Sequence, residues 1–122
     1  MPCVTGEYGL KDRLNMVFPL ECDENCRMLV YNPKTMSLID RLPAIIESGV
    51  NVLRIEARRE EPYWVRKVVG VYREEIDRCE RQREGQREGQ QRAMDVSDRN
   101  KEILKSLAPA GYTTGHYFRG VL

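Results

Sequence analysis

Histidine is almost absent from this sequence, and long apolar runs and a large net charge are missing. The one histidine, His116, makes no zinc site by itself, because such sites use three or four side chains. A formal net charge of +1 gives no global electrostatic reason to expect binding to nucleic acid or membrane. No apolar run approaches the roughly 18 residues that span a bilayer, and residues 1–7 lack the apolar segment of a secretion signal. We therefore expect a cytoplasmic protein that does not associate with membranes.

The composition allows one domain with a modest core. The chain has 122 residues, of which 41% are hydrophobic and 32% are charged. Its four cysteines are expected to be thiols or metal ligands rather than disulfides, because the cytoplasm is reducing. These cysteines are Cys3, Cys22, Cys26 and Cys79.

Residues 49–78 carry the clearest structural signal. An apolar strand is predicted over residues 51–57, followed by an amphipathic helix over residues 62–77. Charged side chains where a strand runs toward a helix occupy the usual place of a site in an α/β protein. The charged residues here are Arg54, Glu56 and Arg58, and the apolar stripe of the helix comprises Trp64, Val65, Val68, Val69, Tyr72 and Ile76.

Short β-prone runs precede this region. Residues 7–13 and 16–21 predict a hairpin, and residues 27–31 predict a third strand. Pro19 limits the second run to an edge position or a bulge, because proline cannot donate a ladder hydrogen bond.

Two further helices are expected. Residues 35–48 read as a short first turn followed by a helix that begins at Pro43, where proline suits the first helical position, and Gly49 is the natural C-cap. A last helix is expected over residues 98–107. The order strand, helix, strand, helix implies parallel strands with right-handed crossovers.

The inventory of strands is too small for a complete parallel sheet, whose strands need cover on both faces. We expect an α/β fold: a partial barrel-like arrangement of strand–helix units with a short N-terminal β-hairpin, part of a larger TIM-barrel-like domain. The α/β region takes residues 1–78. A polar Gln/Arg/Glu/Gly linker takes residues 79–96, and a short helix with a glycine- and aromatic-rich tail takes residues 97–122.

Three segments, residues 7–32, 38–77 and 111–122, together resemble the C-terminal part of the U32 peptidase family, the collagenase-like proteases. The resemblance implies a barrel-like catalytic region and, in several members, a 4Fe–4S cluster. Members with the cluster are linked to oxygen-independent hydroxylation of ubiquinone precursors and RNA bases. By this resemblance Cys3 and Cys26 match two cluster ligands. The set is incomplete, so a cluster is expected only in a full-length protein and not for this chain alone.

The charged strand has two interpretations. Arg54, Glu56 and Arg58 form either an ion-pair ladder with a structural role or a pocket in which arginine binds a carboxylate or phosphate. In the second case Glu56 is a candidate general base and Arg54 its catalytic partner. The candidate substrate-binding residues are Arg58, Asn32, His116 and Arg119.

The resemblance implies peptide-bond hydrolysis as the function. One alternative is a part in iron–sulfur-dependent hydroxylation of an RNA base or quinone precursor. Another is a truncated binding or assembly segment without catalysis. The expected partners are a missing N-terminal part of the barrel, or a chain that supplies it, with a peptide or RNA substrate. A homo-oligomer is a further expectation.

Overall fold

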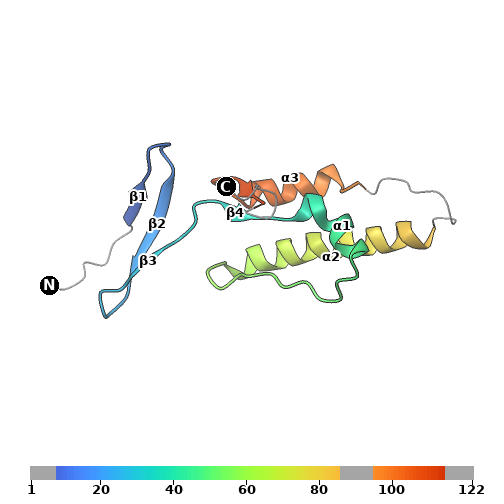
Figure 1. Cartoon of the computed structure of the whole chain (residues 1–122), viewed down its shortest axis with the longest axis horizontal. Helices are drawn as coiled ribbons and strands as arrows, with labels where there is room; N and C mark the ends of the chain where they lie inside the picture. The colour runs from blue at the N-terminus through green and yellow to red at the C-terminus, as the bar shows by residue number, and fades with distance from the viewer. Residues whose placement is uncertain (1–7, 86–94, 115–122) are drawn as a thin grey trace. The chain divides into compact units, whose positions relative to one another are not determined.

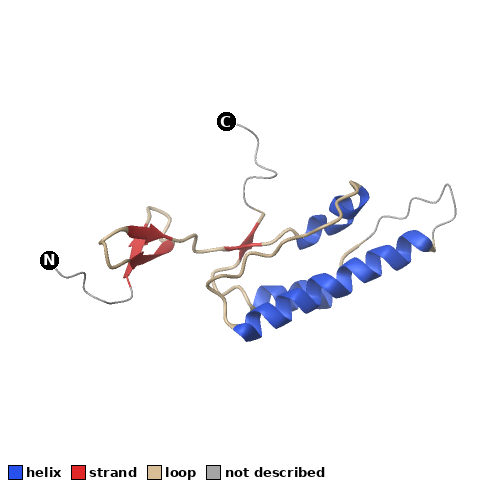
Figure 2. Cartoon of the chain, turned by 90° about the horizontal axis from the view of Figure 1, so that it is seen from below, coloured by secondary structure: helices blue, strands red, loops and turns tan. Residues whose placement is uncertain are grey.

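The computed structural model of the protein describes residues 8–85 and 95–114, and it contains two compact units. The first unit comprises residues 1–35 and the second residues 36–122. The first holds a small sheet and the second holds the helices (Figures 1 and 2). The protein is therefore mixed α/β, and each unit is described by itself.

The first unit is an antiparallel sheet in the order β1-β2-β3. Its strands are β1 (Tyr8–Lys11), β2 (Val17–Cys22) and β3 (Met28–Val30). The predicted hairpin is confirmed. In its turn the Asp12 carboxylate accepts hydrogen bonds from the N–H groups of Leu14 and Met16, at 2.8 and 2.9 Å. Asn15 takes a φ of 62°, a left-handed conformation that asparagine tolerates better than most residues.

The prediction for Pro19 is wrong, because β2 is the central strand of this sheet. Pro19 lies opposite Gly9 on one side, and on the other its carbonyl accepts a hydrogen bond from the Tyr31 N–H at 2.9 Å. In an antiparallel ladder the nitrogen and carbonyl of one residue face the same neighbour. The bond that proline cannot make is therefore directed at β3 just beyond its last residue, Val30, where the ladder ends.

The described residues of the second unit form a short 3₁₀ helix and three α-helices. The 3₁₀ helix η1 (Ile39–Arg41) leads into α1 (Leu42–Glu47), with Pro43 in its first turn as predicted. Gly49 follows with a φ of 84°, which suits its expected place at the C-terminus of this helix. The others are α2 (Pro62–Glu84) and α3 (Asp98–Ser106). Two short strands, β4 (Thr35–Met36) and β5 (Tyr112–Thr113), form a two-stranded sheet.

The core of the second unit lies between these helices. Burial of a valine, leucine or isoleucine side chain stabilises a fold by about 1.5–3 kcal/mol. Trp64 and Tyr72 pack against this core from α2, as predicted. Val69 was predicted to belong to the same apolar stripe, but it is 47% exposed. The buried cluster comprises Ile39, Leu42, Val68, Val71, Val96 and Leu104.

The strand predicted over residues 51–57 does not form as a strand. The segment is extended, and Ile55 packs against the core, but no ladder partner lies beside it among residues 8–85 and 95–114. A strand requires hydrogen bonds from a neighbour, and this part of the chain supplies none. No barrel closes within the described residues. The three-stranded sheet is antiparallel rather than parallel, because short turns join its consecutive strands.

Within the described parts of the chain, no helix combines the length and apolar character needed to cross a membrane.

Candidate functional site: an exposed Arg–Glu–Arg cluster

The extended segment brings the three predicted charged side chains together. Nη2 of Arg54 lies 2.6 Å from Oε1 of Glu56, and Nε of Arg58 lies 3.3 Å from Oε2 of the same carboxylate. Side chains two residues apart in an extended chain point to one face, so the alternation noted in the sequence produces this contact. We call these three residues the Arg–Glu–Arg cluster.

The cluster is solvent-exposed. Its side chains are 76%, 57% and 83% exposed for Arg54, Glu56 and Arg58, so the pairing contributes little to stability. Two guanidinium groups and one carboxylate leave a local charge of +1. Guanidinium groups bind phosphate or carboxylate through paired N–H donors. The geometry therefore confirms ion pairing in the segment, and both guanidinium groups remain accessible to solvent.

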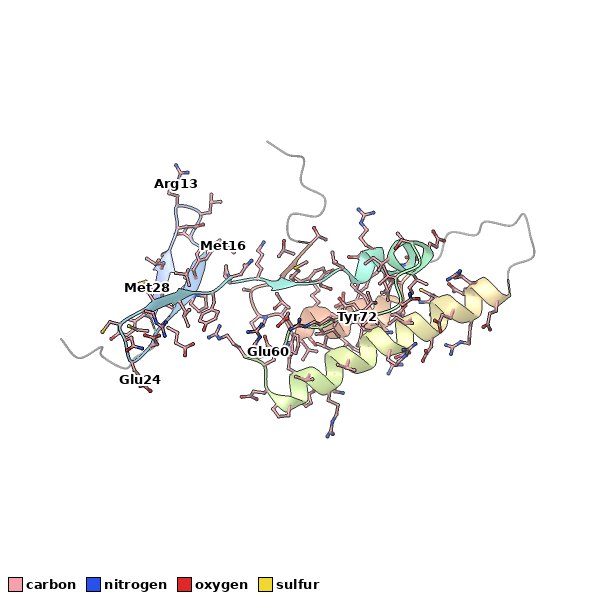
Figure 3. All side chains as sticks on the ribbon, turned by 60° about the horizontal axis from the view of Figure 1, so that its bottom comes forward. Arg13, Met16, Glu24, Met28, Glu60 and Tyr72 are labelled. Atoms are coloured by element: carbon pink, nitrogen blue, oxygen red, sulfur yellow. The ribbon has the colours of Figure 1, made fainter. Side chains whose placement is uncertain are left out.

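The segment that carries the cluster ends in a turn before α2. The N–H of Glu60, labelled in Figure 3, donates to the Ala57 carbonyl at 3.1 Å. Glu61 then precedes the helix in an extended conformation, and Pro62 takes an early helical position that needs no N–H. This turn fixes where the extended chain stops.

Of the other predicted substrate-binding residues, Asn32 is the one that lies within the described part of the chain. Asn32 lies in the first unit, where its side-chain oxygen accepts a hydrogen bond from the Lys34 N–H at 3.0 Å and so stabilises a local turn. His116 and Arg119 lie outside the described residues.

The cysteines do not form a ligand set within residues 8–85 and 95–114, where no group of three or more histidine, cysteine or acidic side chains converges. Cys26 lies in the turn between β2 and β3 with a φ of 57°, its N–H donating to the Asp23 carbonyl at 3.0 Å. Contrary to the expectation of thiols or metal ligands, Cys26 is disulfide-bonded, and it would need reduction before it could bind iron. Cys3 lies outside the described residues. The described residues therefore do not fit a cluster by themselves.

A buried polar network between α2 and α3 was not predicted. Glu75 is fully buried, and its Oε1 accepts hydrogen bonds from Asn100 Nδ2 at 2.6 Å and from the Ser97 N–H at 3.3 Å. Arg78 donates to Oε2 at 3.5 Å. A carboxylate beside the first residues of a helix is favoured by the helix dipole. The available signal was a glutamate three residues after Tyr72 on the apolar stripe of the helix.

Cys79 lies one turn further along α2 and is 1% exposed. Burial raises the pKa of its thiol, and the nearby carboxylate of Glu75 raises it further. Since the thiolate is the reactive form, Cys79 is a packing residue and a poor nucleophile.

The two units define a mixed α/β protein whose exposed charged segment precedes its longest helix. The model of the peptidase family U32 matches residues 7–121, and the chain belongs to this family. It is also similar to the tRNA hydroxylation protein P1 of Bacillus subtilis (strain 168), with 44% identity over 46 residues. That match covers 38% of this chain and 11% of the relative. No solved structure matches the chain.

Proposed function

We propose that this chain takes part in hydroxylation of an RNA base rather than in hydrolysis of peptide bonds. The observation that carries the proposal is its similarity to a protein named for tRNA hydroxylation, at 44% identity over 46 residues. The same family carries the name of a peptidase, so family membership alone does not separate the two reactions.

The Arg–Glu–Arg cluster supports RNA as the substrate. Most protein contacts to nucleic acid go to phosphate, and arginine binds phosphate with two parallel N–H bonds. Arg54 and Arg58 flank one carboxylate on one face of an extended chain and are largely exposed. We assign to these arginines the binding of a phosphate, and to Glu56 the orientation of both guanidinium groups, with general-base chemistry as its further role.

A cysteine peptidase would require an activated thiol. The sole histidine, His116, lies outside the described residues. Burial raises the pKa of the Cys79 thiol. A nucleophilic cysteine needs a lowered pKa, and Cys79 does not meet this requirement.

The match covers 11% of the relative, so most of that relative has no counterpart in the matched residues. We propose that further polypeptide completes a barrel-derived catalytic domain around the described units. Soft thiolates select iron–sulfur clusters. Cys3 and, once reduced, Cys26 would supply two of four ligands. No catalytic step is assigned to such a cluster here.

The test is nucleoside analysis of RNA by liquid chromatography and mass spectrometry in the organism that encodes the chain. Deletion of the gene should remove a hydroxylated nucleoside, and complementation should restore it. Complementation with Arg54→Ala/Arg58→Ala should restore much less, whereas Arg66→Ala, an exposed arginine of α2, serves as the matched control and should restore it fully. Unchanged hydroxylation in the deletion strain, with loss of gelatin hydrolysis, would establish the peptidase instead.

A non-catalytic assembly segment is the second candidate function, and the sheet of the first unit favours it. The register places apolar side chains of all three strands on one face, and several are about half exposed. An exposed apolar face of this kind is typical of a surface that another polypeptide covers. Glu56→Gln separates the readings, since it should leave assembly intact and lower hydroxylation only if the cluster serves the reaction. The face comprises Tyr8, Leu10, Phe18, Leu20, Met28 and Val30.

A further inference from the structure

Tyr63 is the exposed aromatic residue among the described residues of the second unit. It lies in the first turn of α2, directly after Pro62, and it is 65% exposed. The next residue, Trp64, packs against the core and donates its indole N–H to the Leu107 carbonyl at 3.3 Å. The start of α2 is therefore anchored through Trp64, and the ring of Tyr63 is left at the surface.

The ring of Tyr63 is contacted by a cation from its own helix. Nζ of Lys67, one turn later on α2, lies 5.7 Å from the centroid of the Tyr63 ring. A lysine ammonium at this distance is attracted to the face of an aromatic ring, so the contact favours one orientation of the ring. Exposed aromatic rings beside positive charge are the surfaces on which proteins stack the bases of single-stranded nucleic acid.

Tyr63 lies near the Arg–Glu–Arg cluster along the chain. It follows Arg58 by five residues, which corresponds to at most about 19 Å between the two Cα atoms in an extended chain. The turn in which the Glu60 N–H donates to the Ala57 carbonyl at 3.1 Å shortens this distance. Figure 1 shows the chain passing from this turn directly into α2. A single strand of a few nucleotides can therefore reach both the arginines and the ring.

Completion of a barrel by further polypeptide is compatible with access to this end of the segment. Barrel enzymes build their sites from the loops that follow the strands, at the end where each strand stops. Here the turn of residues 57–60 and the first turn of α2 follow the extended residues 51–57. Neighbouring strands of a barrel would lie beside the segment, and Tyr63 would stay at the end where substrate enters.

We propose that the ring of Tyr63 stacks on a base of the RNA whose phosphate Arg54 and Arg58 bind. This inference deepens the proposed function and rests on it. Stacking requires a base that has left its own duplex neighbours, so Tyr63 restricts the bound RNA to an unpaired segment. Because every base has a π-face, the contact adds affinity with little preference for the kind of base.

Equilibrium binding of RNA by the full chain separates stacking from phosphate contact. The probe is a labelled single-stranded oligoribonucleotide of mixed sequence and about ten nucleotides, followed by fluorescence anisotropy. Tyr63→Leu should weaken binding roughly tenfold, whereas Tyr63→Phe keeps the ring and should bind like the wild type. The slope of log affinity against log salt concentration should be unchanged in Tyr63→Leu. It should become shallower in Arg54→Ala/Arg58→Ala, because only the arginines contact phosphate.

Two further measurements make the test specific to stacking. A duplex of the same sequence is the matched control ligand, and wild type and Tyr63→Leu should bind it equally, because its bases are stacked on one another. Single-stranded RNA that carries iodouridine should crosslink to Tyr63 on irradiation, as mass spectrometry of the labelled peptide would show. Circular dichroism checks that Tyr63→Leu keeps the fold, which the exposure of this residue leads us to expect.

The outcomes distinguish this inference from the proposed function. If Tyr63→Leu binds the single strand as tightly as the wild type while the arginine variant binds more weakly, stacking is overturned and the proposed function stands. If the arginine variant also binds like the wild type, the phosphate site fails and the proposed function fails with it. A wild-type chain that binds neither RNA would count against both.

Discussion

Removal of the buried carboxylate of Glu75 should destabilise the second unit more than any other single polar substitution in it. Its side chain is fully buried and holds Asn100 and the N–H of Ser97, the residue before α3. In Glu75→Ala both donors lose their acceptor inside the protein. An unsatisfied buried group costs about 1–3 kcal/mol, and breaking a buried charged contact costs up to about 3–5 kcal/mol.

We therefore expect Glu75→Ala to lower the free energy of unfolding by about 3 kcal/mol, a large share of the 5–15 kcal/mol typical of a domain. Glu75→Gln keeps an acceptor for Asn100 and should cost about 1 kcal/mol. Urea denaturation followed by far-UV circular dichroism reports the second unit, because all three α-helices lie there.

Two comparisons make this prediction specific. Glu74→Ala, an exposed neighbour on α2, is the matched control and should change stability by less than about 0.5 kcal/mol. A double-mutant cycle with Asn100→Ala should give a coupling of about 1–2 kcal/mol, because the two side chains lie 2.6 Å apart. A Glu75→Ala protein as stable as the wild type, or a coupling near zero, would refute the network.

Three further outcomes are expected. In the native protein the exposed Cys22 should react with a thiol reagent at once, whereas Cys79, buried and with a raised pKa, should react only on unfolding; equal rates would contradict this. Tyr72→Phe should cost about 1 kcal/mol in urea denaturation, because it loses the 2.9 Å hydrogen bond to Ser37, and no change would refute that bond. Asp23 accepts hydrogen bonds from the backbone and side chain of Arg27, which lower the pKa of its carboxyl group, so its NMR titration midpoint should lie below 3.8. The stability that Asp23 contributes should be present above its unfolded-state pKa and should be lost as the pH falls through its folded-state pKa. A midpoint at or above 3.8 would contradict this prediction.

Local patterns predicted the elements whose physical cause is local. The helix α2 follows from an apolar stripe and an early proline, and α1 begins where Pro43 suits its first turn. The hairpin follows from two β-prone runs with Asn15 in the left-handed region between them. Each of these depends on residues within a few positions of one another, so a single sequence contains the information.

The features that sequence reasoning missed depend on spatial neighbours, which a local sequence pattern does not identify. Pro19 is tolerated in a central strand only because β3 ends beside it. Glu75 could be recognised as buried only once α3 brought Asn100 and Ser97 to its carboxylate. Glu75 follows Tyr72 by three residues on α2, but that spacing does not say that a polar partner lies 25 residues away.

The segment around the Arg–Glu–Arg cluster shows the same limit more sharply. Period-two alternation set Arg54, Glu56 and Arg58 on one face, and the measured ion pairs confirm it. The alternation fixes how side chains point, but a strand also needs ladder bonds, and a chain segment cannot supply those to itself. An extended, anchored and unpaired row of backbone groups is therefore an incomplete structure whose completion must come from another strand.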